Sequence, residues 1–179
     1  PGPGMDLVGR LTAWFNNVSF IAEDLGSLTP QVHKMLADSG LPGMKVLEFA
    51  FDPNSLSDYL PHRIGENSIC YAGTHDNNTL RGWIDEENPE TLAFAREYLG
   101  IDDDADLADA VLRAGMRSKA ELFIAQMQDW LGLGVDARMN TPGTVGGNWA
   151  WRMTPGSETK ALAGKMRRMA YIYGRSDKK

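Results

Sequence analysis

Three short apolar segments, separated by a helical segment and a polar loop, constrain the fold of this 179-residue chain most strongly. We expect strands at 18–22, 45–51 and 68–72, with a helix over 30–39 between the first two. Strands joined by helices or long loops are typical of a parallel sheet, because parallel neighbours need a crossover connection. The sequence therefore predicts an α/β fold.

Apolar residues recur at helical intervals in several other parts of the chain. The glycine-rich segment 138–151 is expected to be a loop, whereas 119–130 fits either a buried strand or part of a helix. Proline at the first helical position and glycine just after the last one indicate where some of the helices begin and end. Helices are expected over 5–15, 30–39, 89–100, 105–116 and 157–173.

Charge and hydropathy exclude two classes of partner. The chain has 24 acidic and 18 basic side chains and a net charge of −6, and no basic stripe stands out. Binding to nucleic acid is therefore not expected. No apolar run approaches the roughly 20 residues that a membrane-spanning helix needs, so we expect no membrane association.

Cys70 is the only cysteine, which excludes an internal disulfide and is consistent with a reducing cytoplasm. Because it lies in an apolar strand-like run, we expect Cys70 to be a small core residue rather than a nucleophile. The first residues have neither the basic start nor the apolar centre of a signal peptide. A start at Pro1 suggests a chain cut from a longer protein, and a cytoplasmic location is expected.

Carboxylates follow two of the expected strands. Glu23 comes directly after 18–22, and the segment Gly73-Thr74-His75-Asp76-Asn77 follows 68–72. The carboxyl ends of parallel strands open onto one face, where α/β barrels build their active sites. Two acids from two strand ends can therefore meet over one substrate, which is the arrangement that cleavage of a glycosidic bond requires.

Other interpretations of these acids stay open. Successive strand residues point to opposite faces, so Glu23 and Asp24 should not both face the same centre. Both could instead cap the turn before the helix at Pro30. Asp76 and Asn77 follow glycine and are also good turn-forming residues.

Metal binding is an alternative role for His75, with His33 and His62 as further ligands. None of these histidines has a second ligand at a helical spacing, and His33 lies on an expected surface helix. We therefore expect no metal site.

The loop over 138–151 combines tryptophans with amide and guanidinium donors, which is typical of a sugar site. Rings such as that of Trp149 can stack on the apolar faces of a sugar, while Arg138 and Asn140 can donate to its hydroxyls. The alternative is a packed loop whose tryptophans belong to the core, and this holds for Trp151 in particular. The glycines of the loop match neither the dinucleotide-binding nor the P-loop spacing.

Six segments, in this order along the chain, together resemble the 4-alpha-glucanotransferases, the amylomaltase or disproportionating-enzyme family. The resemblance implies a TIM-type (β/α)8 barrel that transfers maltooligosaccharyl units between α-1,4-glucans, without a metal or an organic cofactor. Its substrates would be α-1,4-glucans and maltooligosaccharides. The segments are Ile21–Gly26, Leu41–Leu47, Phe49–Phe51, Tyr71–Asn77, Gln128–Gly134 and Asn140–Thr144.

The resemblance also implies roles for individual residues. Glu23 takes the place of the general acid/base, and Asp76 takes that of the carboxylate that stabilises the transition state. His75 resembles a donor to sugar hydroxyls at the cleavage subsite. Phe49 or Phe51 would line the acceptor side. The further candidates for glucan contact are Asp24, Asn77, Phe51, Asn140 and Trp149.

The family's nucleophile is an aspartate at the end of the strand before the one that bears Glu23. Upstream of Glu23 this chain has only Asp6, in an expected helix. The resemblance therefore implies that residues 1–179 are the carboxyl-terminal part of a single catalytic barrel domain, about strands five to eight. Residues 120–126 would then be the last strand, with Gln128 and Asp129 at its active end.

Such a half barrel is expected to be inactive alone, and a non-catalytic glucan-binding or assembly module is the alternative function. Its edges, expected at 18–22 and 120–126, offer unpaired backbone groups to other chains. We therefore expect a homodimer or association with the missing amino-terminal half. Inner-face residues that need an apolar partner are Val46, Leu47, Phe49 and Ile69.

Overall fold

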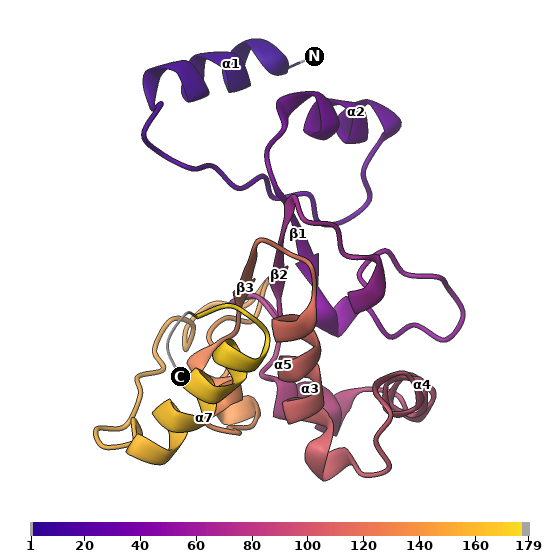
Figure 1. Cartoon of the computed structure of the whole chain (residues 1–179), viewed down its shortest axis with the longest axis vertical. Coiled ribbons are helices and arrows are strands. Elements are labelled where there is room, and N and C mark those ends of the chain that lie inside the picture. The colour runs from indigo at the N-terminus through magenta and orange to yellow at the C-terminus, as the bar shows by residue number, and fades with distance from the viewer. Residues whose placement is uncertain (1, 177–179) are drawn as a thin grey trace.

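The computed structural model describes residues 2–176, which form an α/β fold around a small parallel sheet (Figure 1). Within this range the sheet has three strands, β1 (Gly43–Val46), β2 (Ser68–Tyr71) and β3 (Leu122–Ile124). Their order is β1-β2-β3, and both neighbouring pairs are parallel. The predicted α/β class and the parallel sheet are therefore confirmed.

The strand expected at 68–72 is confirmed, and the ambiguous segment 119–130 contains strand β3. The prediction of a strand over 45–51 is wrong in its extent. β1 begins earlier and ends at Val46, and the 3-10 helix η1 (Leu47–Phe49) follows it. This turn buries Leu47 among helix residues of the core, and an apolar run alone does not distinguish that environment from a strand.

The strand predicted at 18–22 is also wrong, because this segment is not assigned to a strand. Among the described residues, one backbone hydrogen bond joins this segment to the residues just before β1: the Ala22 N–H donates to the Pro42 carbonyl, at 2.9 Å. Val18 remains 51% exposed and Ile21 is also exposed. A strand forms only where a partner supplies hydrogen bonds and burial, and the described residues offer this segment neither beyond Ala22.

Two helices precede the sheet, and both were predicted. These are α1 (Met5–Trp14) and α2 (Pro30–Ser39), which ends at Gly40 in the left-handed conformation. They contact each other, and neither contains a buried residue. Figure 1 shows them at one end of the molecule, away from the other helices.

The remaining α-helices lie after β2, and those expected near 89–100, 105–116 and 157–173 are confirmed. The part of the chain that the structure describes contains no helix long and apolar enough to cross a membrane. Besides η1 there are three short 3-10 helices: η2 (Pro61–Arg63), η3 (Asp104–Asp106) and η4 (Val135–Ala137). The α-helices are α3 (Leu80–Glu86), α4 (Pro89–Leu99), α5 (Leu107–Arg117), α6 (Met127–Trp130) and α7 (Lys160–Ile172).

The two faces of the sheet differ. On one face Cys70 is fully buried, as predicted, and its register partner Phe123 lies so close to α5 that a Cβ on Gly115 would come within 2.1 Å of the phenyl ring. The opposite face bears Leu122 and Ile124, which remain 46% and 36% exposed. The helices therefore cover one face and leave part of the other open.

Of the four inner-face residues expected to need a partner, three are already buried: Val46, Leu47 and Ile69. Phe49 is exposed, and its ring packs edge-on against Tyr59. The exposed apolar surface of the sheet therefore comes from β3 rather than from β1 and β2.

Candidate active site

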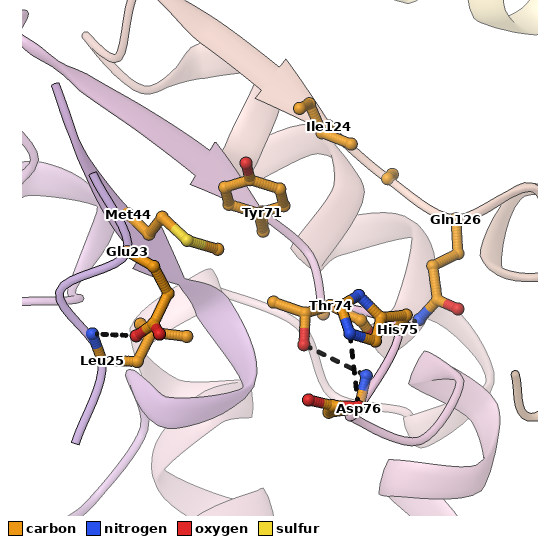
Figure 2. A pocket seen from close by; sticks show the side chains of 11 residues that line it. Glu23, Leu25, Met44, Tyr71, Thr74, His75, Asp76, Ile124 and Gln126 are labelled. Carbon is orange, nitrogen blue, oxygen red and sulfur yellow. Dashed lines mark hydrogen bonds and ion pairs between the residues drawn. The ribbon is translucent and has the colours of Figure 1, made fainter. Parts of the chain in front are cut away.

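A cavity of about 620 Å³ opens at the carboxyl ends of the three strands. Figure 2 shows Glu23 on one side of this cavity and His75 and Asp76 on the other. Tyr71 of β2 lies between them, and Gln126, just after β3, lines the cavity on the side of His75. The sequence predicted that Glu23, His75 and Asp76 meet at one edge of the sheet, and the structure brings all three to the same cavity.

Glu23 lies in the exposed segment that leads from the Ala22 backbone contact toward α2. Its Oε1 accepts the backbone N–H of Leu25 at 2.8 Å (Figure 2). The side chain is exposed, so the second carboxylate oxygen remains accessible from the cavity. Such a carboxyl group is placed to give a proton to, or take one from, a bound molecule.

A hydrogen-bonded turn after β2 places Asp76. The Asn77 Oδ1 accepts the N–H and the hydroxyl of Thr74 at 2.9 and 2.8 Å, and the Thr74 hydroxyl accepts the Asp76 N–H at 3.2 Å. The predicted turn chemistry and the predicted site therefore occur in the same residues. One does not exclude the other.

The loop after η4 holds Asp76 from the opposite side. Asn140 donates its Nδ2–H to the Asp76 carboxylate at 2.6 Å, and the Nε2 of His75 lies 3.3 Å from the same oxygen, Oδ1. Arg138 donates one N–H to the backbone carbonyl of Asp76 at 2.8 Å and another to the carbonyl of Asn140 at 2.9 Å. The loop predicted over 138–151 thus reaches the site and orients its carboxylate.

Trp149 lies beside the same turn. Its ring centre is 4.9 Å from that of His75, and its backbone adopts a φ of 61°. A positive φ is rare for a bulky residue and occurs where the surrounding structure imposes it, often at functional sites. The exposed ring of Trp149 therefore extends the apolar surface next to His75.

Of the candidates for glucan contact, only His75 is among the residues that line the cavity. Asn140 and Trp149 contact Asp76 and His75, and the Asn77 side chain closes the turn.

The other two candidates make their contacts elsewhere. Asp24 faces the backbone of β1, where its Oδ1 accepts the Met44 N–H at 2.6 Å. Phe51 is 1% exposed and packs against Trp83 and Tyr98 in the core. The structure therefore corrects the prediction for Phe51, because a side chain with almost no exposed surface has none to offer a sugar.

Gln128 and Asp129, which were expected at the active end of the last strand, are buried in α6. The Gln128 amide donates to the Ala137 carbonyl at 3.1 Å, and the Asp129 Oδ1 accepts the Leu80 N–H at 2.8 Å. They join the segments behind the cavity instead of lining it. The residue that lines it there is Gln126, whose amide donates to the Thr74 carbonyl at 3.1 Å.

Sequence reasoning missed Gln126 as a site residue and also missed Glu48, a buried acid behind the turn. Burial, with a smaller contribution from the neighbouring Asp129 carboxylate, raises the pKa of Glu48 to about 9. Burial likewise raises the pKa of Asp129 to about 6, against the lowering effect of the Leu80 N–H. Nothing in the sequence indicated the burial of Glu48, because a lone acid within an apolar run usually points to solvent.

The other two histidines lie away from the cavity. His33 is exposed on α2, and His62 hydrogen-bonds the Tyr98 hydroxyl through Nδ1 at 2.9 Å. Within residues 2–176, no group of three or more His, Cys, Asp or Glu side chains could hold a metal ion.

Residues 1–159 match a family model described as 4-alpha-glucanotransferase. The chain belongs to this family. It is 40% identical to the chloroplastic/amyloplastic 4-alpha-glucanotransferase of Arabidopsis thaliana, over 97% of this chain and 31% of that protein. It is 41% identical to the 4-alpha-glucanotransferase of Thermus thermophilus, over 94% of this chain and 35% of that protein.

A solved amylomaltase from Streptococcus agalactiae, in complex with acarbose, superposes on the chain with a TM-score of 0.92 at 36% identity. The match covers 99% of this chain and 36% of that amylomaltase. The amylomaltase from Corynebacterium glutamicum, at 21% identity and a TM-score of 0.66, shares the fold.

The chain therefore spans about a third of the length of the relatives it matches. Since one relative is a chloroplast or amyloplast protein, membership of the family does not assign the chain to the cytoplasm.

Proposed function

We propose that the chain supplies the carboxyl-terminal half of a TIM-type (β/α)8 barrel, as one part of a single catalytic domain. The helices cover one face of its parallel sheet and leave Leu122 and Ile124 exposed on the other, as expected where further strands close a barrel. In such a barrel β1, β2 and β3 are strands six to eight.

The function that the site supports best is transfer of α-1,4-glucan segments between maltooligosaccharides by a retaining double displacement. The observation that carries it is that Glu23 and Asp76 line one cavity at the carboxyl ends of the strands. In this reaction an aspartate from outside the 179 residues attacks the anomeric carbon while Glu23 protonates the leaving oxygen. Glu23 then takes the proton from the hydroxyl of the incoming sugar while the oxygen of that hydroxyl attacks the anomeric carbon. The bond to the aspartate breaks, the aspartate leaves as a carboxylate, and Glu23 has regained its proton.

Asp76 acts on the sugar ring rather than on the leaving group. Its carboxylate accepts from sugar hydroxyls and attracts the positive charge that develops at the ring in the transition state. Asn140 and Arg138 hold it in place, which keeps the electrostatic stabilisation ready before the substrate binds. His75 donates to sugar hydroxyls, Trp149 offers a stacking surface, and the reaction so described needs no cofactor.

The role of Glu23 can be tested in a complete enzyme that contains these residues. Glu23→Gln should nearly abolish transfer from maltotriose but spare the first step with a glycosyl fluoride, whose leaving group needs no acid. Asp24→Asn, in the neighbouring carboxylate that faces β1, is the matched control and should affect both donors alike. Equal losses with both donors in Glu23→Gln would show that Glu23 is structural.

A second candidate function is a glucan-binding or assembly half-barrel that does not turn over. The exposed apolar side chains on β3 favour this second function for the chain alone, because an exposed apolar surface is stabilised when another surface covers it. The 179-residue chain is expected to associate, with itself or with the missing half, and to release no glucose from maltotriose. Light scattering and a glucose assay test this. A stable active monomer would contradict the half-barrel proposal.

A further inference from the structure

Behind the turn that carries His75 and Asp76 lies a buried acid that the reaction does not use. Glu48 is 8% exposed, and its backbone N–H donates to the Ala72 carbonyl at 3.2 Å. A Cβ on Gly73 would lie 2.4 Å from its Oε1, so the carboxyl group rests directly on the backbone of the turn. The side chain of Asn77, which closes the turn, hydrogen-bonds it.

Charged groups approach Glu48 from three other elements. Asp129 of α6 and Glu87, after α3, are acidic, and Arg138, after η4, is the cation that faces it. Glu48 Oε1 and Asp129 Oδ2 are buried oxygens without a hydrogen-bond partner among the described residues. Two ionised carboxylates here would leave unsolvated charge, so the site favours one proton on the pair.

The same Arg138 links this buried pair to the proposed catalytic turn. Its guanidinium donates to the backbone carbonyl of Asp76 at 2.8 Å and to that of Asn140 at 2.9 Å. Asn140 in turn donates to the Asp76 carboxylate. A change in charge at Glu48 therefore acts on a cation that holds Asp76 in place.

We propose that Glu48 is a positioning residue for Asp76, acting as a neutral carboxylic acid beneath the Gly73–Asn77 turn. With Glu48 neutral, the buried pair carries at most one negative charge, and Arg138 stays bonded to the Asp76 backbone. Ionisation of Glu48 adds a second negative charge that competes for Arg138 and loosens the turn. The catalytic part of this inference rests on the proposed function, whereas the protonation state of Glu48 does not.

The first test needs no activity. In the full 179-residue chain labelled with ¹³C at the glutamate carboxyl carbons, the signal that disappears in Glu48→Gln is assigned to Glu48 and followed with pH. It should keep the shift of a protonated carboxyl at pH 7 and titrate with a pKa of about 9. A signal that titrates between pH 4 and 5 would overturn the proposal.

The second test uses a complete enzyme that contains these residues. Glu48→Ala, which leaves the turn unsupported, should lower kcat about 100-fold with little change in KM, the size of effect expected when a reacting group is misplaced. Glu48→Gln is neutral and of similar shape, so it should recover most of that turnover and abolish the loss of activity near pH 9. Glu97→Gln, in an exposed residue of α4, is the control and should keep the wild-type pH profile.

The two failures are distinguishable. The positioning role would be overturned if Glu48→Gln were as inactive as Glu48→Ala. It would also be overturned if Glu48→Gln still lost activity near pH 9 as the wild-type enzyme does. Absence of transfer in the wild-type enzyme would overturn the proposed function instead, and the carboxyl titration would then decide the state of Glu48 alone.

Discussion

Residues 2–42 and residues 43–176 each carry a proposed catalytic carboxylate, but they hold it very differently. α1 and α2 in the first region contain no buried residue, whereas α5, in the second region and of similar length, buries five. All three are helical, so local propensity and pattern are sufficient to form a helix. Packing against a partner contributes most of a helix's stability. Among the described residues α1 and α2 contact each other without burying a residue, whereas α5 packs in the core.

The same contrast applies to the site. Asp76 is held through its carboxylate by Asn140 and through its backbone by Arg138. The Glu23 carboxylate accepts from the nearby Leu25 N–H, in a segment with exposed apolar side chains. One wall of the cavity is therefore held by hydrogen bonds from a distant segment, whereas the other is held by a local one.

The largest difference is expected for matched leucine truncations. Leu112→Ala, in a fully buried position of α5, should lower the free energy of unfolding by about 3 kcal/mol through lost burial and the cavity left behind. Leu7→Ala, in an exposed position of α1, should change it by less than about 0.5 kcal/mol. Urea unfolding of the two variants measures both. Equal losses would show that α1 is packed in solution, for example against a second copy of the chain.

A pH dependence of stability is expected from the second region. Burial raises the pKa of Glu48 from 4.5 to about 9, so between these values the folded state binds a proton that the unfolded state has released. Stability from this group is present in full below pH 4.5 and is lost as pH rises toward 9. The slope is about 1.4 kcal/mol per pH unit, or about 2 kcal/mol between pH 7 and 8.5.

Urea titrations at these two pH values measure the loss, which Glu48→Gln should largely remove. Glu97→Gln, the exposed control, should retain it. A wild-type stability that does not change across this range would rule out a neutral Glu48.

Glycine-to-alanine substitutions in two helices should change the free energy of unfolding in opposite directions. A Cβ at Gly115 of α5 would lie 2.1 Å from the Phe123 ring, so Gly115→Ala should destabilise the chain by about 1–2 kcal/mol. Gly9 of α1 has open space around it, and Gly9→Ala should favour that helix by about 0.5–1 kcal/mol. Thermal unfolding followed by circular dichroism separates the two. A destabilising Gly9→Ala would indicate that another surface covers α1.

The smallest difference concerns the helix caps. Thr79 is buried, and its hydroxyl accepts the Gly82 N–H at 3.0 Å, so Thr79→Ala should cost about 1 kcal/mol. Thr29 is the N-cap residue just before α2, but its side chain makes no capping hydrogen bond within the described residues. Thr29→Ala should therefore change the free energy of unfolding by only a few tenths of a kcal/mol. Comparable losses in chemical denaturation would mean that Thr29 caps α2 in solution.

The helix boundaries were readable from the sequence because their signals act over one or two turns. Pro30 and Pro89 begin helices and Gly40 and Gly100 end them, as predicted, since the missing N–H of proline and the left-handed conformation of glycine act locally. The strand ends were harder. An apolar run such as 18–22 becomes a strand only beside a partner, and the partner is not encoded in the run itself.

For the site, too, some features were predicted from the sequence and others were not. The placement of His75 and Asp76 at the cavity followed from their position after a strand, because the ends of parallel strands share one edge of the sheet. Glu23 reaches the same cavity although 18–22 is not a strand in the structure. The burial of Phe51, the support of Asp76 by Arg138 and the pairing of Glu48 with Asp129 became visible only in the tertiary structure. Burial and charge pairing depend on which distant segments pack together, whereas a turn or a helix end depends on its immediate neighbours.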